Sequence, residues 1–274
     1  MEEKIKYMFL GFIFTTIVYG IIGVGVLYVA NKKSEQIDSN PIKELGNFAC
    51  EDFSGALNTF NSEYVINDGY LYALNPNMKY SNEQNCKKIS DIKISKVINS
   101  VYVAEDGNLY TYDSSSDEFK STSASVPSYL LGGDIVKAVS YGKDYEHKYY
   151  VLKTDGKLYK VSFNRTLASN GQSYVYTLTR DELYKSYEEE TIKTFNSYND
   201  QINLIVTDKA IYTNKITNPE CMQYADVECE LEFTKNDVLK ESMDNIKYIN
   251  SYNNSTILYI TNDNAMYSFN ILES

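Results

Sequence analysis

Aspartate recurs in one local pattern along this chain, and pairs of carboxylates are what most glycoside hydrolases use to cleave a sugar bond. The five recurring residues are Asp68, Asp106, Asp155, Asp208 and Asp263. Hydrolysis needs two acids at a defined separation across the sugar, whereas aspartate at a tight turn already has a structural reason to be there. We therefore predict no catalytic residues. An extracytoplasmic carbohydrate-active enzyme stays as the alternative to a binding role.

Other residues capable of catalysis or metal binding are few. His147 is the only histidine, it has no supporting motif, and we interpret it as an exposed loop residue. The chain has no G-x-S-x-G, no phosphate-binding glycine loop, no H-E-x-x-H and no EF-hand loop. The acidic clusters at residues 113–118, 188–190 and 226–232 lack the spacing of a known calcium loop, so we interpret them as solvated surface charge. No cofactor and no metal site are predicted.

The composition indicates a folded, β-rich domain with an acidic surface. Hydrophobic residues make up 43% of the chain and charged residues 23%, which is ordinary for a globular protein. Tyrosine occurs 27 times and tryptophan not at all, and tyrosine favours strands. The formal net charge is −11, and an acidic domain repels phosphate backbones. Nucleic acid is therefore not a predicted partner.

Residues 8–30 are predicted to form one transmembrane helix, after a short N-terminal segment (1–7) and before a linker (31–46). The run carries no charge and would be about 34 Å long as a helix, enough to cross a hydrocarbon core of about 30 Å. A cleaved signal peptide is the competing interpretation, but its apolar region would be about 7–15 residues long and would end in small residues. We expect an uncleaved single-pass anchor in the cell membrane. The lysines that flank both ends do not decide its orientation.

The cysteines suggest that the domain after the helix is extracytoplasmic. Cys50, Cys86, Cys221 and Cys229 all follow the predicted anchor, and an even number suggests two disulfides in an oxidising space. Cys221 and Cys229 are close enough in sequence to close a local loop, which leaves Cys50 to pair with Cys86. Four reduced, structural cysteines in a cytosolic domain are the alternative. There is no Cys-x-x-Cys pair, so a zinc site is not predicted.

An internal repeat is the strongest pattern in the sequence. In every copy, the residues four and three positions before the aspartate are apolar. Three positions after the aspartate comes Leu, Ile or Met, and the next residue is tyrosine; the tyrosines are Tyr72, Tyr110, Tyr159, Tyr212 and Tyr267. Asp-Gly supplies the positive φ that a type I′ turn requires, so each segment predicts a β-hairpin. Lys209 and Asn264 replace the glycine in the last two copies. Asparagine tolerates left-handed geometry, whereas lysine does so at some cost, so the fourth turn is expected to differ. We expect the five tyrosines to pack between neighbouring units.

The repeat unit is longer than its hairpin. At least three copies share a first strand that starts at Ile135, Ile192 or Ile246, and fourth strands are predicted near residues 173–179 and 228–234. Thr179 and Thr234, each followed three residues later by an acid, predict helix N-caps, so a short helical turn would connect the units. The turn aspartates lie 38, 49, 53 and 55 residues apart. Four-stranded propeller blades need about 40–50 residues.

These patterns predict an all-β fold: a β-propeller of about five four-stranded blades over residues 47–274, preceded by the transmembrane helix. The last copy ends just after its third strand, so residues 47–57 could supply the missing strand, and a disulfide between Cys50 and Cys86 would pin that closure. An open array of β-units and a β-sandwich are the rival folds.

The apolar strand followed by Asp-Gly-x-Leu-Tyr resembles the blades of regulator-of-chromosome-condensation-type propellers and their bacterial membrane-anchored relatives. The resemblance covers most of residues 57–271 and implies a propeller fold with a binding role. The glycine-histidine pair and the tryptophan-glycine ending typical of that family are missing, and five units are present rather than seven. The exchange-factor activity of the founding member does not carry over, because its functional loop has no match here.

The function predicted from the sequence is a non-enzymatic, extracytoplasmic binding module, anchored to the membrane through residues 8–30. Its ligand would be a protein, a peptide or a cell-wall glycan. The carbohydrate-active enzyme introduced above is one alternative, and a scaffold for an envelope complex is another.

Overall fold

In the computed structural model of the chain, the described residues are 42–47, 64–74, 86–113, 116, 118–142, 146–198, 200–217, 230–237, 239, 242–251 and 256–270. They belong to one compact unit that runs from Ile42 to Ser274, so it begins five residues before the predicted domain start at residue 47. The predicted membrane segment 8–30 lies outside the described residues. Within the described part of the chain, no helix has both the length and the apolar character that a membrane crossing requires.

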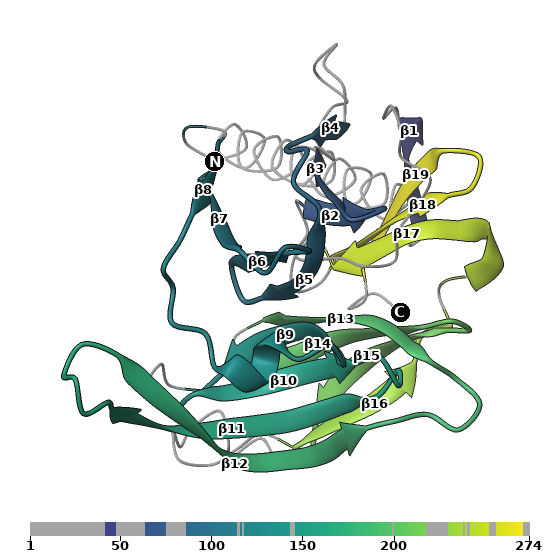
Figure 1. The fold of residues 1–274 in the computed structure, drawn as a ribbon. Coiled ribbons are helices and arrows are strands. Elements are labelled where there is room, and N and C mark those ends of the chain that lie inside the picture. Colours follow the sequence, from purple (N-terminus) through teal and green to yellow (C-terminus); the bar gives the residue numbers. More distant parts are fainter. Residues whose placement is uncertain are drawn as a thin grey trace, which may run out of the picture. The chain divides into compact units, whose positions relative to one another are not determined.

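The all-β prediction is confirmed, and the described strands form four sheets (Figure 1). Five units with antiparallel strands can be distinguished in them, because units 2 and 3 join into one eight-stranded sheet through the parallel pair β5–β9. Unit 1 contains β2 (Tyr64–Asn67), β3 (Tyr70–Leu74) and β4 (Cys86–Lys88). Unit 2 contains β5 (Ile94–Ile98), β6 (Val101–Ala104), β7 (Leu109–Asp113) and β8 (Glu118–Ser121). Unit 3 contains β9 (Ile135–Tyr141), β10 (Lys148–Lys153), β11 (Leu158–Leu167) and β12 (Tyr174–Lys185). Unit 4 contains β13 (Ile192–Tyr198), β14 (Gln201–Thr207), β15 (Ile211–Ile216) and β16 (Leu231–Lys235). Unit 5 contains β17 (Ile246–Ser251), β18 (Thr256–Thr261), β19 (Ala265–Asn270) and, from the other end of the chain, β1 (Ile42–Asn47).

Strand β1 completes unit 5 by pairing antiparallel with β19, with Ile42 opposite Phe269 and Asn47 opposite Ala265. The last unit therefore takes its outer strand from the N-terminal side of the domain, as the short final repeat predicts. That strand lies at residues 42–47 rather than at residues 47–57, and so within the segment predicted as a linker.

The hairpin turns differ in type. Asp68 and Gly69 have φ values of 49° and 80°, so the first turn has positive φ at both central positions, as a type I′ turn requires. In the fourth turn neither Asp208 nor Lys209 has a positive φ, in agreement with the loss of the glycine.

The turns of units 2, 3 and 5 are not type I′, which corrects the sequence prediction for those copies. Positive φ occurs only at the residue after the aspartate, at Gly107 (85°), Gly156 (71°) and Asn264 (70°). The N–H of each donates to the carbonyl three residues earlier at 3.0 Å. This pattern fits a three-residue loop in which a left-handed residue follows a type I turn. Glycine and asparagine are the residues that adopt this conformation at least cost.

A β-bulge recurs near the start of the first strand in units 2 to 5. β5, β9, β13 and β17 each begin with isoleucine, and the pairing with the next strand skips the residue after it. Bulges of this kind re-aim the following side chain. The post-bulge residues are Lys96, Lys137, Thr194 and Tyr248, and all four are buried.

Five buried hydrophobic clusters connect the units, and each contains residues from two of them. Members from the two units are Leu71 and Tyr102 (units 1 and 2), Ile98 and Val151 (units 2 and 3), Leu152 and Phe195 (units 3 and 4), Leu204 and Ile257 (units 4 and 5), and Tyr248 and Val65 (units 5 and 1). Each unit thus packs against the units before and after it in the chain, and the last packs against the first. A single hairpin could not bury its apolar side chains alone.

The connectors differ from the helical turns that the sequence predicts. Thr179 lies inside strand β12, where it is the extra residue at a bulge opposite Ser162 and Phe163. The helix predicted there is wrong, because pairing with β11 holds the backbone extended. Thr234 likewise lies in β16. A short 3₁₀ turn, η4 (Met243–Asn245), does precede unit 5, but it starts at the N-cap Ser242.

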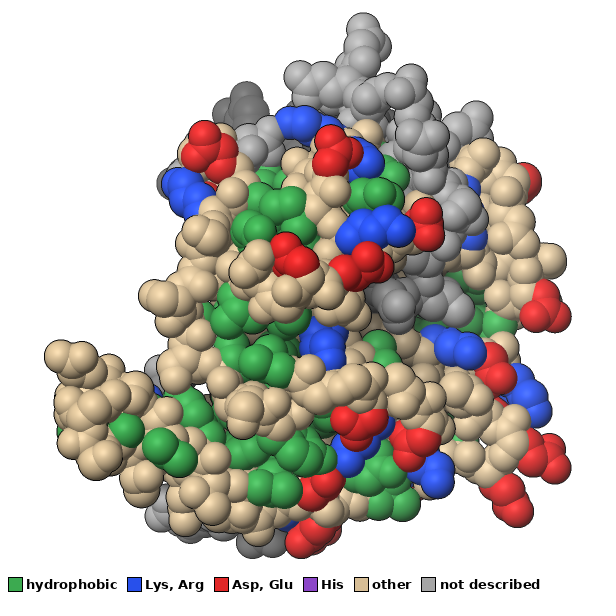
Figure 2. Space-filling view, viewed as in Figure 1, with side chains coloured by type: hydrophobic (Ala, Val, Ile, Leu, Met, Phe, Trp, Pro, Cys, Tyr) green, Lys and Arg blue, Asp and Glu red, His purple; other side chains and the backbone are tan. Residues whose placement is uncertain are grey.

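The β11–β12 hairpin of unit 3 is the longest in the described chain, and it exposes large apolar side chains on one face. Leu167, Tyr174, Leu178 and Leu183 are 58%, 47%, 41% and 54% exposed, and the strand register places them on the same side of the hairpin. Figure 2 shows hydrophobic side chains at the surface of this hairpin, whereas acidic and basic side chains are dispersed over the visible face.

Candidate functional site

The five predicted turn aspartates lie in five separate turns, and four of them accept hydrogen bonds from backbone N–H groups: Asp106, Asp155, Asp208 and Asp263. Asp106 Oδ1 accepts a hydrogen bond from the N–H of Asn108, and Asp155 Oδ1 accepts one from the N–H of Lys157, both at 3.0 Å. Asp208 Oδ1 instead accepts from the N–H of Thr191 at 2.9 Å, so it fixes the loop that enters unit 4. These bonds explain why the turns select aspartate.

The five repeat tyrosines lie at the boundaries between units. Tyr72 is buried in the cluster shared by units 1 and 5. The others pack, partly buried, against the cluster shared with the preceding unit; they are Tyr110, Tyr159, Tyr212 and Tyr267. Two of their hydroxyls also donate hydrogen bonds to carboxylates: Tyr159 to Asp155 at 2.6 Å and Tyr212 to Glu190 at 3.0 Å.

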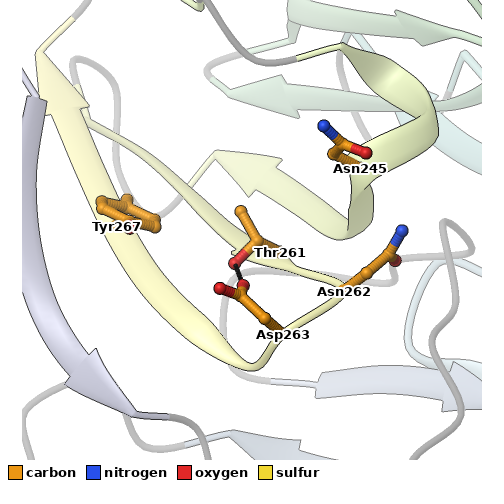
Figure 3. A pocket seen from close by; sticks show the side chains of 5 residues that line it. All are labelled: Asn245, Thr261, Asn262, Asp263 and Tyr267. Carbon is orange, nitrogen blue, oxygen red and sulfur yellow. Dashed lines mark hydrogen bonds between the residues drawn. The ribbon is translucent and has the colours of Figure 1, made fainter.

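A polar pocket of about 290 Å³ opens at the β18–β19 turn of unit 5. Its lining residues are Asn245, Thr261, Asn262, Asp263 and Tyr267. In Figure 3, Tyr267 stands on one side, the two asparagines stand on the other, and the pair formed by Thr261 and Asp263 lies between them. The pocket thus combines residues from β18, β19, their turn and the 3₁₀ turn that precedes the unit.

Two hydrogen bonds fix the turn against the 3₁₀ turn η4. The N–H of Asn262 donates to the carbonyl of Asn245 at 2.8 Å, and its Nδ2 donates to the carbonyl of Asp244 at 2.7 Å. The Ser242 hydroxyl caps η4 by accepting from the N–H of Asp244 at 3.4 Å. The turn is therefore fixed without the carboxamide of Asn245 and without the side-chain oxygen of Asn262.

Asp263 carries the negative charge of the pocket. Thr261 Oγ1 donates to its carboxylate, and this bond lowers the pKa of Asp263; the backbone N–H of Ala265 and the nearby ammonium of Lys247 act in the same direction. Asp263 is exposed and ionised at neutral pH. Burial lowers the pKa of Lys247, whose Nζ donates to Asn264 Oδ1 at the same turn.

The remaining lining groups are neutral. Asn245 is exposed, and its carboxamide has no hydrogen-bond partner among the described residues. Asn262 uses its amide nitrogen within the loop, and the structure shows no described partner for its oxygen. Tyr267 is half-buried, and its ring stacks on Tyr259 with the centroids 5.0 Å apart and the planes inclined by 16°. The site can hydrogen-bond in both directions and presents one aromatic side chain.

Only part of this pocket is predicted by the sequence pattern. Asp263 and Tyr267 stand out as repeat residues, whereas Asn245, Thr261 and Asn262 do not. The signal that could have found them is the turn of unit 5 itself, because Asn262 and Asn264 flank the aspartate where three other copies have Asp-Gly.

Glu190, in the acidic cluster at residues 188–190, is not simply solvated surface charge. Its carboxylate accepts hydrogen bonds from Thr207 Oγ1 at 2.6 Å and from the Tyr212 hydroxyl at 3.0 Å. Burial and the bond to Glu190 raise the pKa of Tyr212 to about 12. Glu190 therefore ties the start of unit 4 to its hairpin. Among the described residues, no group of three or more His, Cys, Asp or Glu is arranged to hold a metal ion.

His147 is half-buried rather than exposed as predicted. Its ring meets the edge of the Tyr176 ring at a centroid distance of 5.4 Å, and its carbonyl accepts from the N–H of Phe163 at 3.1 Å. Burial, together with the charge of Arg165, lowers the pKa of His147. These contacts are structural, and none places the imidazole beside a nucleophile.

Cys86 is buried in the cluster shared by units 5 and 1, with 3% of its surface exposed. The described residues include no free cysteine. Cys50, Cys221 and Cys229 lie outside the described residues, so both predicted pairings stay predictions.

Two buried lysines connect neighbouring units, and no pattern in the sequence predicts them. Lys137 Nζ, on β9, donates to the carbonyl of Phe195 on β13 at 2.7 Å. Lys96 Nζ, on β5, donates to the carbonyls of Leu131, at 3.1 Å, and Gly132 in the loop before β9. Burial lowers the pKa of Lys137 to about 7. A neutral amine could act as a base, but this side chain is enclosed between units and has a structural contact to explain it.

A second polar cluster ties the start of unit 3 to its outer strand. Lys153 Nζ lies 3.0 Å from Asp181 Oδ2 and 2.9 Å from the hydroxyl of Tyr129, which itself donates to Asp181. Tyr129 belongs to the short 3₁₀ turn η2 (Ser128–Leu131). The three groups form hydrogen bonds with one another, so we interpret the cluster as a structural contact and not as a reactive site.

The comparisons with known proteins identify no family. No protein-family model matches the chain, and no curated protein matches it. Among solved structures, one similar chain comes from a Saccharomyces cerevisiae complex of a Dbp5 variant with Nup159, a Gle1 variant, IP6 and ADP. The alignment has 9% identity and a TM-score of 0.24, and it covers 76% of this chain and 62% of that chain, less than two thirds of its length. A likeness at that TM-score carries no argument about fold or function.

Proposed function

We propose that this chain is a membrane-anchored binding protein whose five units close into a five-bladed β-propeller outside the cell membrane. The observation that carries the closure is the cyclic order of the hydrophobic clusters. In the cluster shared by units 5 and 1, Val65 and Leu74 pack with Leu258 and Met266. Strand β1 then adds the outer strand of unit 5. An open array would leave one face of unit 1 and one face of unit 5 without such a partner.

The pocket at the β18–β19 turn supports binding rather than hydrolysis. One of its five lining residues is an acid, Asp263, whereas most glycoside hydrolases use two carboxylates across the sugar. The other turn aspartates lie in the turns of other units. The uncharged carboxamides and the fixed aromatic ring are groups that orient a ligand, as expected of a recognition site.

The location outside the cell rests on the sequence. Residues 8–30 supply the anchor, and the two predicted disulfides require an oxidising space. A bridge between Cys50 and Cys86 would tie the N-terminal part of the domain to unit 1 next to the closing cluster. Thiol labelling of intact cells with a membrane-impermeant maleimide, before and after a membrane-impermeant reductant, tests both points. We expect labelling only after reduction; labelling that requires permeabilised cells would contradict the proposed side of the membrane.

The binding role is tested with the full-length chain purified in mild detergent and applied to glycan and peptide arrays. We expect a ligand that dissociates unchanged, and the same bound samples are examined for cleavage products by mass spectrometry. Catalytic turnover that is lost in Asp263→Asn would overturn the proposal in favour of the carbohydrate-active enzyme. Retention of no probe on either array would also count against it.

A further inference from the structure

The pocket at the β18–β19 turn has a size and chemistry that select one class of ligand. From its lining groups and their geometry we infer that it binds one neutral pyranose ring of a glycan. This inference rests on the binding role proposed above, and it names the ligand class for that role.

The size of the pocket limits what can enter. Its volume is about 290 Å³. Pockets for drug-sized molecules span about 300–1,000 Å³, so this pocket lies at their lower limit. A single six-membered ring fits that space, whereas a peptide segment of several residues would lie mostly outside it.

The polar groups match a ligand that both donates and accepts hydrogen bonds. The carboxamide of Asn245 offers two N–H donors and one acceptor oxygen and has no described partner. On the same wall, the oxygen of Asn262 is an acceptor. Asp263, ionised, only accepts. Adjacent sugar hydroxyls can donate to the carboxylate and exchange both kinds of bond with the carboxamide.

The charges favour a neutral sugar over a charged ligand. An acidic sugar, a phosphate or a carboxylate would meet Asp263 and a chain of net charge −11. An amine would meet Lys247, whose ammonium stabilises the charge of Asp263 and donates to Asn264 in the same turn. Because Thr261 and the turn backbone already hydrogen-bond the carboxylate, it does not need a cation to be satisfied.

Tyr267 supplies the wall on which a sugar ring can pack. Its ring stacks on the buried Tyr259 and is half-buried itself, so little side-chain freedom is lost when a ligand arrives. The C–H face of a pyranose is apolar and packs against aromatic rings, while its hydroxyls point sideways. Figure 3 shows the asparagines across the pocket from Tyr267, where they can meet such hydroxyls.

The test titrates the full-length chain in detergent with chitotriose, cellotriose and maltotriose as neutral probes. Trigalacturonic acid is the anionic probe and Lys-Gly-Gly the cationic one, and saturation-transfer NMR reports the bound protons. We expect at least one neutral trisaccharide to bind with millimolar affinity, through one of its rings. Asn245→Ala should weaken that binding about tenfold, and Asn164→Ala, at an exposed asparagine on β11, should change it by less than about twofold.

Tyr267 gives a second, graded test. Tyr267→Phe keeps the ring and should bind the sugar within about threefold of the wild type, whereas Tyr267→Leu should weaken binding tenfold or more. Circular dichroism and the melting temperature of each variant separate lost binding from lost folding.

Each remaining outcome overturns a different claim. Sugar binding that Asn245→Ala and Asn164→Ala leave equally intact would overturn this pocket as the site, while the binding role would stand. Binding of Lys-Gly-Gly or trigalacturonic acid alone, sensitive to Asn245→Ala, would overturn the neutral sugar as the ligand class. Binding of array peptides but of none of the three neutral sugars would overturn this inference and leave the binding role intact.

Discussion

Gly156 connects units 3 and 4, and its replacement by alanine should cost more stability than the same change at Gly107. Both glycines have positive φ, at 71° and 85°, so alanine pays about 1 kcal/mol at either site for the left-handed backbone. A Cβ at Gly107 meets nothing within 4 Å. A Cβ at Gly156 would overlap Thr191 Cγ2 and lie 3.3 Å from Thr191 Cβ and 3.4 Å from its Cα.

Thr191 cannot easily move away from that methyl group. Its N–H donates to Asp208 Oδ1 at 2.9 Å, and its carbonyl accepts from the N–H of Asp208 at 3.0 Å. The next residue, Ile192, donates its N–H to the carbonyl of Gly156 at 3.0 Å. Overpacking of a fixed site costs about 1–3 kcal/mol, and a weakened hydrogen bond adds about 0.5–1.5 kcal/mol. Together with the cost of the left-handed backbone, we expect Gly156→Ala to lose roughly 2.5–5.5 kcal/mol in total.

The assay is urea unfolding with a thermal melt of each variant in the full-length chain. At about 2–4 °C per kcal/mol for a domain of this size, Gly107→Ala should melt a few degrees below the wild type and Gly156→Ala about 5–20 °C below it. Thr191→Ser removes the overlapping methyl group, so the double variant Gly156→Ala/Thr191→Ser should recover at least about 1 kcal/mol. Equal losses in the two glycine variants, or no recovery in the double variant, would refute the packing argument.

Three further predictions follow from the buried polar groups and from the exposed apolar face of the β11–β12 hairpin. Lys137 has a folded pKa of about 7 against an ordinary value of 10.5, so the unfolded chain binds more protons between those pH values. The free energy of unfolding should therefore rise by a few kcal/mol, at most about 4, from pH 7 to 10. Urea titrations at several pH values should show that this slope vanishes in Lys137→Met but not in the exposed control Lys157→Met. Asp181→Asn removes the anion that pairs with Lys153 and should lower the free energy of unfolding by about 1–2 kcal/mol. The loss is moderate because both side chains are partly exposed. An unchanged midpoint of urea unfolding would contradict this expectation. Leu178→Thr should change the free energy of unfolding by less than about 0.5 kcal/mol, since the Leu178 side chain is exposed. A larger loss would mean that the apolar face of the β11–β12 hairpin is covered in solution.

The repeat could be predicted from the sequence because each unit has the same local pattern of turn and strand residues. Asp-Gly marks a turn whatever surrounds it, and the tyrosine four residues later falls at the same position of the following strand, so both positions are readable without tertiary information. The sequence predicts the closing strand at residues 47–57 rather than at 42–47, because a short closing strand has no adjoining turn that marks its position. Its pairing with β19 depends on a partner more than 200 residues away in the sequence.

The pocket and the buried lysines could not be predicted for a different reason. The inner strands read as ordinary alternating segments, and the bulge that turns Lys96 and Lys137 inward is visible only in the pairing register. A lysine in a strand normally indicates a side chain that is exposed to solvent. In the same way, Asn245 and Asn262 are seventeen residues apart and become neighbours only when the 3₁₀ turn docks on the hairpin. Local patterns carry no information of that kind.

The post-bulge positions make the five interfaces unequal, although the repeats look alike. Lys137 donates to a backbone carbonyl of the next unit, and Lys96 donates to carbonyls in the loop that leads into the next unit. The equivalent residues of units 4 and 5 are Thr194 and Tyr248. Burying an amine costs free energy that an apolar residue would not, so stability alone does not explain the lysines. Our hypothesis is that they specify which unit follows which, because a unit docked on the wrong neighbour would leave the amine without its carbonyl. Lys137→Met should then be at least as stable as the wild type yet refold to a mixture of forms. A single refolded species would refute this hypothesis.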